Sequence, residues 1–376
     1  MAAESHSLLG GSSAKRWLEC PPSARAAEAA ENEASPFAEE GSRAHLLAEY
    51  KLKGILGLQQ EPLPDDAEFD PEMEECTDDY AQFCAGLWAD AGKGSVPAVE
   101  ARVDFSRYVP EGFGTADFAL VGDGFIHIVD LKYGKGVPVS AVENPQMKLY
   151  AIGAIAAYGD LFEINDVRMT IFQPRLGNVS TFETTRKELE DWAENYVKPR
   201  ADLAWKGLGE FKEGEWCRFC RIRARCRKRA EANLELAKLE FKDPATLTDA
   251  EIAEVLSKSE ELSSWANDVR EYALSEALKG KRFPGWKVVE GKSTRRFADE
   301  DAVAKAVLAL GKDPYRRSLL TITDMTKLLG KKGFDDALGG LVEKPRGKPT
   351  LAPESDKRPE FAVDSARNDF NDNKEE

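Results

Sequence analysis

The chain has 376 residues, a formal net charge of −15, and a composition of 42% hydrophobic and 32% charged residues. This length favours two domains over a single small core. The acidic charge excludes a protein that coats nucleic acid nonspecifically, but it is compatible with an enzyme that has one local basic groove. No apolar run approaches the roughly 20 residues of a membrane-spanning helix, and the N-terminus lacks the layout of a secretory signal. We therefore expect a cytoplasmic protein without membrane contact.

The first part of the chain is predicted to be mostly helical. Apolar residues recur with helical spacing in three segments. These are residues 12–30, 39–52 and 71–91. The first is interrupted at Cys20-Pro21-Pro22, and the acidic, proline-bearing segment 60–71 is predicted to be a loop. Cys76 and Cys84 have core-like spacing on the third helix, so we expect them to be packing residues.

Strand character begins at residue 96 and covers three segments. These are residues 96–105, 116–121 and 125–131. Gly122-Asp123-Gly124 joins the last two as a tight turn, which predicts a β-hairpin. A helix over 144–158 and a further strand over 167–173 follow. This order of helices, three strands, helix and strand predicts an α/β fold with a mixed sheet flanked by helices.

From residue 187 onward the chain is predicted to be helical and strongly charged. A break at 241–244 separates a first domain from a smaller α+β unit that contains a helix over 249–279. A proline- and charge-rich tail follows, which we expect to be extended or disordered. The core domain, the smaller unit and the tail have the bounds 1–240, 245–345 and 346–376.

Two acidic residues and a lysine mark the predicted hairpin. Asp117 lies at the start of one strand, and Asp130 and Lys132 lie at the end of the next. Strand alternation projects Asp130 and Lys132 from the same face, and the hairpin can bring Asp117 close to them. Clustered carboxylates repel each other unless a cation lies between them, and hard oxygen ligands suit Mg²⁺ or Mn²⁺. Such an ion would polarise a phosphoryl oxygen and help to ionise an attacking water, while Lys132 orients the water or stabilises developing charge. An Asp–Lys pair on a surface hairpin is the simpler alternative.

Two further motifs flank the hairpin. Gly41-Ser42-Arg43-Ala44-His45 places a histidine on the upstream helix. Gln146 and Tyr150 are spaced i and i+4, on one face of the helix that follows. The ordered set GxxxH, GxxD, DxK and QxxxY resembles the signature of RecB-like PD-(D/E)XK nucleases, including the CRISPR-adaptation and AddB-type enzymes.

This resemblance implies a restriction-endonuclease-like core and a metal-dependent deoxyribonuclease. It also implies three metal ligands, a catalytic lysine and two residues that line the DNA path. In that order they are His45, Asp117 and Asp130, then Lys132, then Gln146 and Tyr150. Glu100, on the preceding strand, is expected to support the site. From the residues alone, His45 could instead be an ordinary helix histidine, and Tyr150 a core residue.

Four cysteines form a second constellation. Cys217, Cys220 and Cys226 have the spacing C-x2-C-x5-C, and Cys20 lies far upstream. In a reducing compartment such a set is not a disulfide framework, and four thiolates select zinc or an iron–sulfur cluster. One cysteine before the nuclease motifs and three after them is similar to the iron–sulfur nucleases of the RecB group. This implies a [4Fe–4S] cluster on the four cysteines that staples the helical segments together, with Zn²⁺ as the alternative.

Arginines crowd this cysteine segment and can neutralise phosphates and guide DNA toward the metal, although a solvated helix face is the alternative. They are Arg218, Arg221, Arg223, Arg225, Arg227 and Arg229. In the second unit, Gly285-Trp286-Lys287 and Arg295-Arg296 are compatible with DNA contact, and equally with a β-hairpin that has a basic rim.

Nearly the whole chain resembles a phage- and prophage-borne family of unassigned function, through Arg16-Trp17-Leu18-Glu19-Cys20-Pro21, the nuclease motifs, the Gly-Trp-Lys segment and residues 347–351. The resemblance implies a role in phage replication or recombination in a bacterial host. We expect an exonuclease that acts on DNA ends or single strands, with recombination or single-strand-binding proteins as partners. The alternative is a catalytically quiet DNA-binding or recombination-scaffold protein.

Overall fold

The computed structural model describes residues 7–28, 30, 36–64, 67–235, 248–289, 304–305, 308 and 321–342. The chain divides into two compact units, Met1–Lys279 and Gly280–Glu376. The predicted break at 241–244 and the predicted tail lie outside the described residues.

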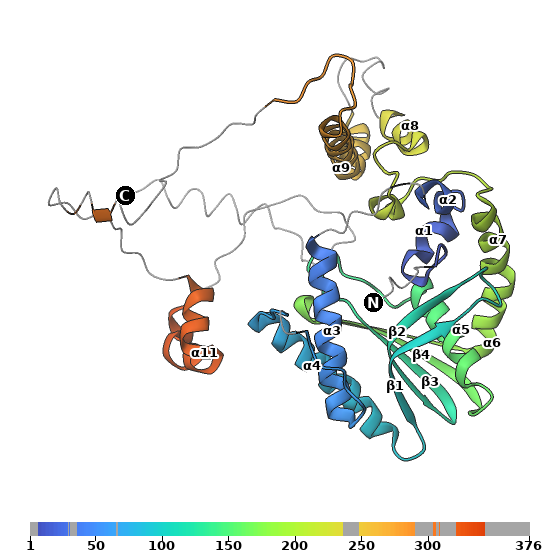
Figure 1. The fold of residues 1–376 in the computed structure, drawn as a ribbon, viewed down its shortest axis with the longest axis vertical. Coiled ribbons are helices and arrows are strands. Elements are labelled where there is room, and N and C mark those ends of the chain that lie inside the picture. Colours follow the sequence, from blue (N-terminus) through green and yellow to red (C-terminus); the bar gives the residue numbers. More distant parts are fainter. Residues whose placement is uncertain are drawn as a thin grey trace. The chain divides into compact units, whose positions relative to one another are not determined.

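A five-stranded mixed sheet forms the centre of the first unit (Figure 1). Its strands lie in sequence order: β1 (Val96–Asp104), β2 (Phe113–Gly122), β3 (Gly124–Leu131), β4 (Ile164–Gln173) and β5 (Asn178–Thr185). Only β3 and β4 pair in parallel, and helix α5 (Pro145–Tyr158) makes the crossover between them. The hairpin of β2 and β3 closes at the glycine-flanked turn, with Gly122 paired to Phe125. The prediction of a mixed sheet flanked by helices is confirmed.

Helices cover both faces of the sheet, as Figure 1 shows. On one face, α3 (Pro36–Leu56) and α4 (Pro71–Ala91) pack together over a cluster that includes Phe118, Leu120 and Val129. Cys84 is fully buried in this cluster and Cys76 in a smaller neighbouring one, so their prediction as packing residues is confirmed.

The larger core lies on the opposite face of the sheet, beneath α5. Four further helices contribute to this side: α1 (Ala14–Glu19), α2 (Ser23–Glu28), α6 (Arg186–Trp192) and α7 (Lys198–Lys206). Helix α5 is buried at every position from Met147 to Ile155, and Asn144 caps its start by accepting from the backbone N–H groups of Gln146 and Met147. Burial and capping together hold the first turn of α5 in one orientation.

Strand β5 was not predicted from the sequence. Its side chains alternate between half-buried and exposed, and only Val179 and Phe182 are large and hydrophobic. An edge strand with one partner needs little apolar surface, so it lacks the hydrophobic run that marks the inner strands.

Beyond the sheet, α8 (Arg227–Glu235) contacts the long helix α9 (Asp249–Leu278) within the first unit. Helix α9 confirms the prediction for 249–279. In the second unit, the described residues include α11 (Ile322–Leu338), which is kinked at Gly330, where φ is +70°.

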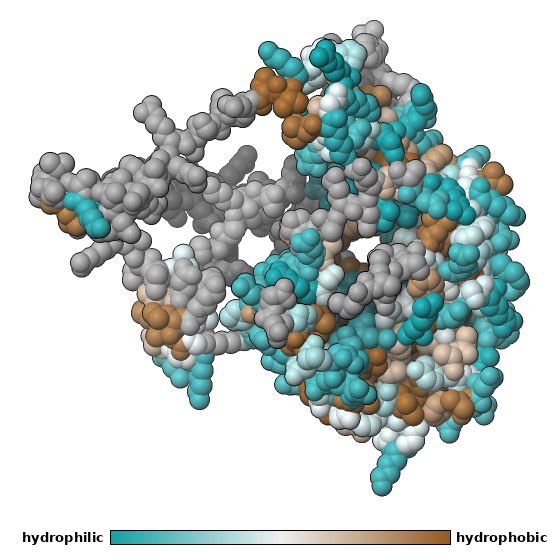
Figure 2. Space-filling model, in the orientation of Figure 1, coloured by the Kyte–Doolittle hydropathy of each residue, from teal (hydrophilic) through white to brown (hydrophobic). Residues whose placement is uncertain are grey.

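The described helices include none that is long and apolar enough to cross a membrane. Figure 2 shows hydrophilic side chains over most of the face in view, with hydrophobic ones in small separate groups. Scattered exposed hydrophobic side chains are normal on a protein surface.

Candidate active site

A histidine and two acidic side chains from three different elements meet beside the first two strands. They are His45 of α3, Glu100 of β1 and Asp117 of β2, and their ligand atoms all lie within 4.8 Å of one another. His45 Nδ1 is 3.4 Å from Asp117 Oδ1. One imidazole nitrogen and two carboxylates form a donor set that suits a divalent cation. The structure thus brings together two of the three predicted ligands and adds Glu100, which was expected only to support the site.

Both strands are distorted where they carry these carboxylates. Val99 pairs with Phe118 and Ala101 with Ala116, so Glu100 lies opposite Asp117. Glu100 has a left-handed backbone with φ of +50°, which is unusual and costly for a residue other than glycine.

At the distortion, the side chains of each strand switch the face of the sheet to which they point. Ala98 and Val103 of β1 both pack in the core beneath α5, although they are an odd number of residues apart. Ala116 and Ala119 of β2 do the same. Regular alternation would place each of these pairs on opposite faces. The alternation of side chains is therefore interrupted in both strands at the same place, at Glu100 and Asp117.

The third predicted ligand, Asp130, is not in that group of three, but it forms a network with the other predicted residues. Its buried carboxylate pairs with Lys132, with 2.7 Å between Oδ2 and Nζ. Gln146 holds both partners, because its Nε2 donates to Asp130 Oδ1 at 2.9 Å and its Oε1 accepts from Lys132 Nζ at 3.2 Å. Gln146 also donates to the hydroxyl of Tyr150 at 3.2 Å. The DxK and QxxxY residues thus form one hydrogen-bonded network.

A backbone hydrogen bond joins this network to the three-residue group. The N–H of Leu131 donates to Asp117 Oδ2 at 2.7 Å. Leu131 lies between Asp130 and Lys132 in the chain, so this bond fixes the end of β3 against β2. The predicted site residues consequently lie in one continuous set of contacts.

The carboxylates and the histidine perturb one another strongly. Burial raises the pKa of Glu100 to about 8, and the Asp117 carboxylate adds to this shift. Burial also raises the pKa of Asp130. Burial lowers the pKa of His45, but the adjacent Asp117 carboxylate outweighs this, and the net pKa rises to about 9. The group therefore retains protons at neutral pH, and a divalent cation would bind there in exchange for protons.

Two glycines make room for the ring of Tyr150. A Cβ atom at Gly11 would lie 2.5 Å from Tyr150 Cε1, and one at Gly114 would lie 2.6 Å from the same atom. Gly114 is the glycine of the GxxD motif. Its role here is steric, because any side chain at this position would displace the tyrosine from Gln146.

The four cysteines predicted to bind a cofactor also lie near one another. Cys20 follows α1, which contacts the short helix η4 (Glu215–Phe219) that contains Cys217. Cys20, Cys217 and Cys220 are buried, Cys226 is half-buried, and all four are free thiols. Burial raises the pKa of Cys217 to about 11, and the neighbouring sulfurs of Cys220 and Cys226 contribute. Residues far apart in the chain are thus gathered at one place.

Two guanidinium groups flank these cysteines. Arg16 Nη1 donates to the backbone oxygen and the hydroxyl of Ser23, at 2.9 and 3.0 Å. Burial lowers the pKa of Arg16, whereas the sulfurs of Cys220 and Cys20 oppose that effect. Within the described ranges, neither Arg16 nor Arg221 forms an ion pair with an acidic side chain. Because Arg16 is partly buried and such a charge is normally paired, thiolates at Cys20 and Cys220 would supply the missing negative charge.

Arg175 is a residue of this region that the sequence did not reveal. It lies in the short helix η2 (Pro174–Leu176), where Nη1 pairs with Glu40 of α3 at 3.0 Å and Nη2 with Glu72 of α4 at 2.9 Å. Its guanidinium also lies 4.4 Å from the centre of the Tyr133 ring, next to Lys132. A single arginine after a strand has no periodicity or motif that would have predicted these contacts.

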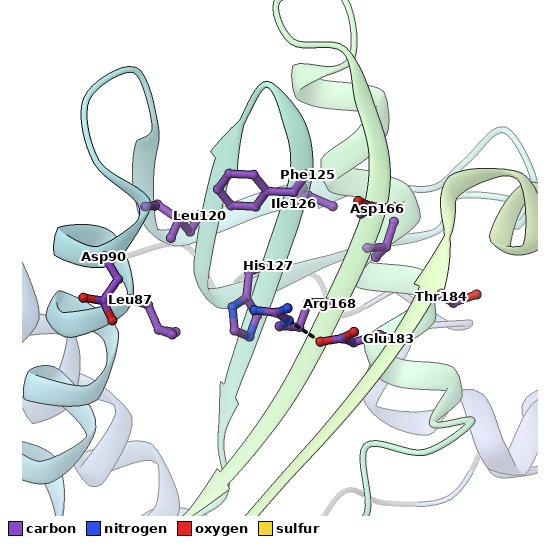
Figure 3. Close-up of a pocket in the computed structure, with 12 residues that line it drawn as sticks. Leu87, Asp90, Leu120, Phe125, Ile126, His127, Asp166, Arg168, Glu183 and Thr184 are labelled. Atoms are coloured by element: carbon purple, nitrogen blue, oxygen red, sulfur yellow. Dashed lines mark hydrogen bonds and ion pairs between the residues drawn. The ribbon is translucent and has the colours of Figure 1, made fainter.

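A separate pocket of about 570 Å³ lies between α4 and the starts of β3 and β4. Figure 3 shows His127 on its wall beside the Arg168–Glu183 ion pair. His127 Nε2 is 2.8 Å from the hydroxyl of Thr170, and burial lowers the pKa of His127 to about 4. None of the predicted site residues lines this pocket.

The chain is similar to a solved structure and to a described protein family. A solved structure titled "Crystal structure of SSO0001" is 13% identical, and the match covers 48% of this chain and 95% of that one, with a TM-score of 0.21. A family model described as "Protein of unknown function (DUF2800)" matches residues 6–359. The prediction that nearly the whole chain resembles one family of unassigned function is thereby confirmed. The chain belongs to this family.

Proposed function

We propose that the protein is a divalent-metal-dependent DNA nuclease of the RecB-like PD-(D/E)XK class, built on a restriction-endonuclease-like core. The observation that carries the proposal is the meeting of His45, Glu100 and Asp117 within 4.8 Å, joined through Leu131 to the Asp130–Lys132 pair. A surface Asp–Lys pair would need neither a buried carboxylate nor a histidine from another helix.

The residues present would divide the chemistry of phosphodiester hydrolysis between them. When bound, Mg²⁺ or Mn²⁺ would polarise a phosphoryl oxygen and help to ionise a water molecule. His45, Glu100, Asp117 and Asp130 would hold the ion. Burial lowers the pKa of Lys132, but the Asp130 carboxylate outweighs this, so Lys132 stays protonated. It therefore acts as a cation that stabilises developing negative charge and not as a general base.

Gln146 and Tyr150 would line the path of the DNA. Gln146 already holds Asp130 and Lys132, so a strand that contacts this amide would lie next to the reacting residues. Tyr150 stays neutral, because burial raises the pKa of its hydroxyl well above the usual value.

We further propose that Cys20, Cys217, Cys220 and Cys226 bind a [4Fe–4S] cluster. The resemblance to the iron–sulfur nucleases of the RecB group favours a cluster over a single zinc ion, and Arg16 and Arg221 supply positive charge beside the cysteines.

In this proposal the enzyme acts as an exonuclease on DNA ends or single strands, during phage replication or recombination in the host cytoplasm. The test uses anaerobically purified protein, labelled single- and double-stranded DNA, and Mn²⁺ or Mg²⁺, with a chelator control. Cleavage is expected only with metal, and Asp117→Asn is expected to abolish it. Cleavage that persists in chelator contradicts the proposal. Tight binding without cleavage under any metal condition would instead support the DNA-binding or scaffold protein.

A further inference from the structure

The arginines around the cysteine segment fall into two groups. Arg223 and Arg229 are engaged by α9: Arg223 Nε lies 2.7 Å from Asp268, and Arg229 pairs with both Glu261 and Asp268. Arg229 is almost fully buried by these contacts. Arg229 of α8 and Arg223 of the preceding turn hold this segment against α9 and are not available to a ligand.

The second group is exposed and has no acidic partner. Its members are Arg218, Arg221, Arg225 and Arg227. In the part of the chain that the structure describes, none of the four forms an ion pair or a side-chain hydrogen bond. This is unusual in a chain with 67 acidic and 52 basic residues, where carboxylates are abundant. Four unpaired guanidinium groups within one short segment create a local positive field.

An exposed aromatic ring lies within this positive segment. Phe219 is 76% exposed, although it lies between the buried residues Cys217 and Ile222. Cys217 N–H donates to Gly214 O and Cys220 N–H to Cys217 O, so the turn is held by its backbone as well as by its buried cysteines. Because Cys217 and Cys220 point inward, Arg218 and Phe219 between them are presented to solvent.

We propose that Arg218, Phe219 and Arg221, here called the arginine–aromatic turn, bind single-stranded DNA. Guanidinium groups neutralise phosphates, and an exposed phenyl ring can stack on an unpaired base. A duplex keeps its bases stacked inside, so it would use the arginines but not the ring. The ring therefore points to single strands as the occupant.

A chain of contacting elements links the turn to the helix that carries Gln146 and Tyr150. Helix η4, which contains Arg218 and Phe219, contacts α1. Both α1 and the preceding short helix contact α5, the helix that carries Gln146 and Tyr150.

This inference deepens the proposed nuclease function, and its test is independent of cleavage. Binding of a labelled single-stranded oligonucleotide is measured by fluorescence anisotropy at several salt concentrations, without added divalent metal. The double variant Arg218→Gln/Arg221→Gln should reduce the slope of log affinity against log salt by about 1.4, since each phosphate contact to a single strand contributes about 0.7. The matched control is Lys187→Gln/Lys198→Gln, which removes two exposed charges from α6 and α7.

The role of the ring is tested separately. Phe219→Ala should weaken single-strand binding about ten-fold and leave duplex binding unchanged, whereas Phe219→Trp should retain single-strand binding. Metal content and the circular dichroism spectrum of each variant are measured to show that the cysteine segment is intact.

Each outcome decides the inference. If the Arg218/Arg221 variant has the same salt slope as the lysine control, the turn does not contact phosphates. If Phe219→Ala weakens single-strand and duplex binding equally, the ring does not stack on bases. If the protein binds single strands through the turn but never cleaves DNA, this inference is supported and the nuclease proposal is overturned.

Discussion

At the scale of single residues, Lys132 is fixed by two acceptors, Asp130 Oδ2 at 2.7 Å and Gln146 Oε1 at 3.2 Å. We expect Lys132→Met to slow cleavage at least about 100-fold, because losing one stabilising charge typically raises a barrier by roughly 3–4 kcal/mol. Lys135→Met is the control, since Lys135 is half-exposed and pairs with Glu72 outside the network. Single-turnover cleavage rates of the two variants test this. Equal cleavage rates of the two variants would show that Lys132 takes no part in the chemical step.

The protons held by the three-residue group predict a pH dependence of stability. The pKa of Glu100 is raised to about 8 and that of His45 to about 9, above the usual values of 4.5 and 6.5. At these two groups the folded protein binds more protons than the unfolded chain, which lowers stability as pH rises. His127 acts in the opposite direction below its usual pKa of 6.5, because burial lowers its pKa to about 4. Stability is therefore expected to fall as pH rises from about 6.5 to about 9. Melting temperatures of metal-free protein across this range test the sign, and Glu100→Gln should flatten the curve. A stability that rises over the same range would contradict the assignment.

The sequence predicted the two pairs of residues in the DxK and QxxxY network, because local geometry brings the members of each pair together. It did not predict the hydrogen bonds that join one pair to the other. Asp130 and Lys132 share a strand face, and Gln146 and Tyr150 share a helix face. The close group of His45, Glu100 and Asp117 depends instead on long-range packing and on the backbone of Glu100. A left-handed glutamate has no sequence signal, so the sequence does not predict that Glu100 lies among the ligand atoms.

At the scale of elements, Arg175 ties α3, α4 and the end of β3 together through Glu40, Glu72 and Tyr133. Arg175→Ala should lower the free energy of unfolding by about 2 kcal/mol, since it leaves two carboxylates without their shared partner. Arg168→Ala is the matched control, because the Arg168–Glu183 pair is exposed on both sides and such pairs contribute little. Chemical denaturation of both variants decides between them. A loss no larger than that of the control would mean that the helices hold their places without Arg175.

Most elements were predictable because their signals are local and strong. The helix over 71–91 has Pro71 in its first turn and Asp70 as its cap, and the hairpin has a glycine on each side of its turn. Strand β5 was missed because its pattern is that of an exposed edge. The change of face within β1 and β2 was also not predictable, since sequence patterns assume that alternation continues.

At the scale of the whole molecule, the proposed cluster would join Cys20 to residues roughly 200 positions later in the chain. Closing a loop of this size restricts the unfolded chain by about 5 kcal/mol, by analogy with a disulfide. Cys20→Ser should therefore destabilise the protein as much as Cys226→Ser does. Cys84→Ser, which changes a packing cysteine, should leave the bound metal in place.

Iron and zinc analysis, the visible absorption spectrum and thermal melts measure these effects on one preparation. We expect about four irons per chain and a broad absorption band at about 400 nm. A colourless protein with one zinc per chain would support the link between the cysteines but contradict the iron–sulfur cluster. A Cys20→Ser protein that keeps its full metal content and its stability would contradict the proposal that Cys20 is linked to the other three cysteines.

The left-handed backbone of Glu100 implies a conflict between folding and activity at one residue. An ordinary residue in this conformation costs about 1–2 kcal/mol, and an acid with a raised pKa is also unfavourably placed. Asparagine adopts this conformation readily and carries no charge. Glu100→Asn should therefore melt at a higher temperature than the natural protein while losing metal-dependent cleavage.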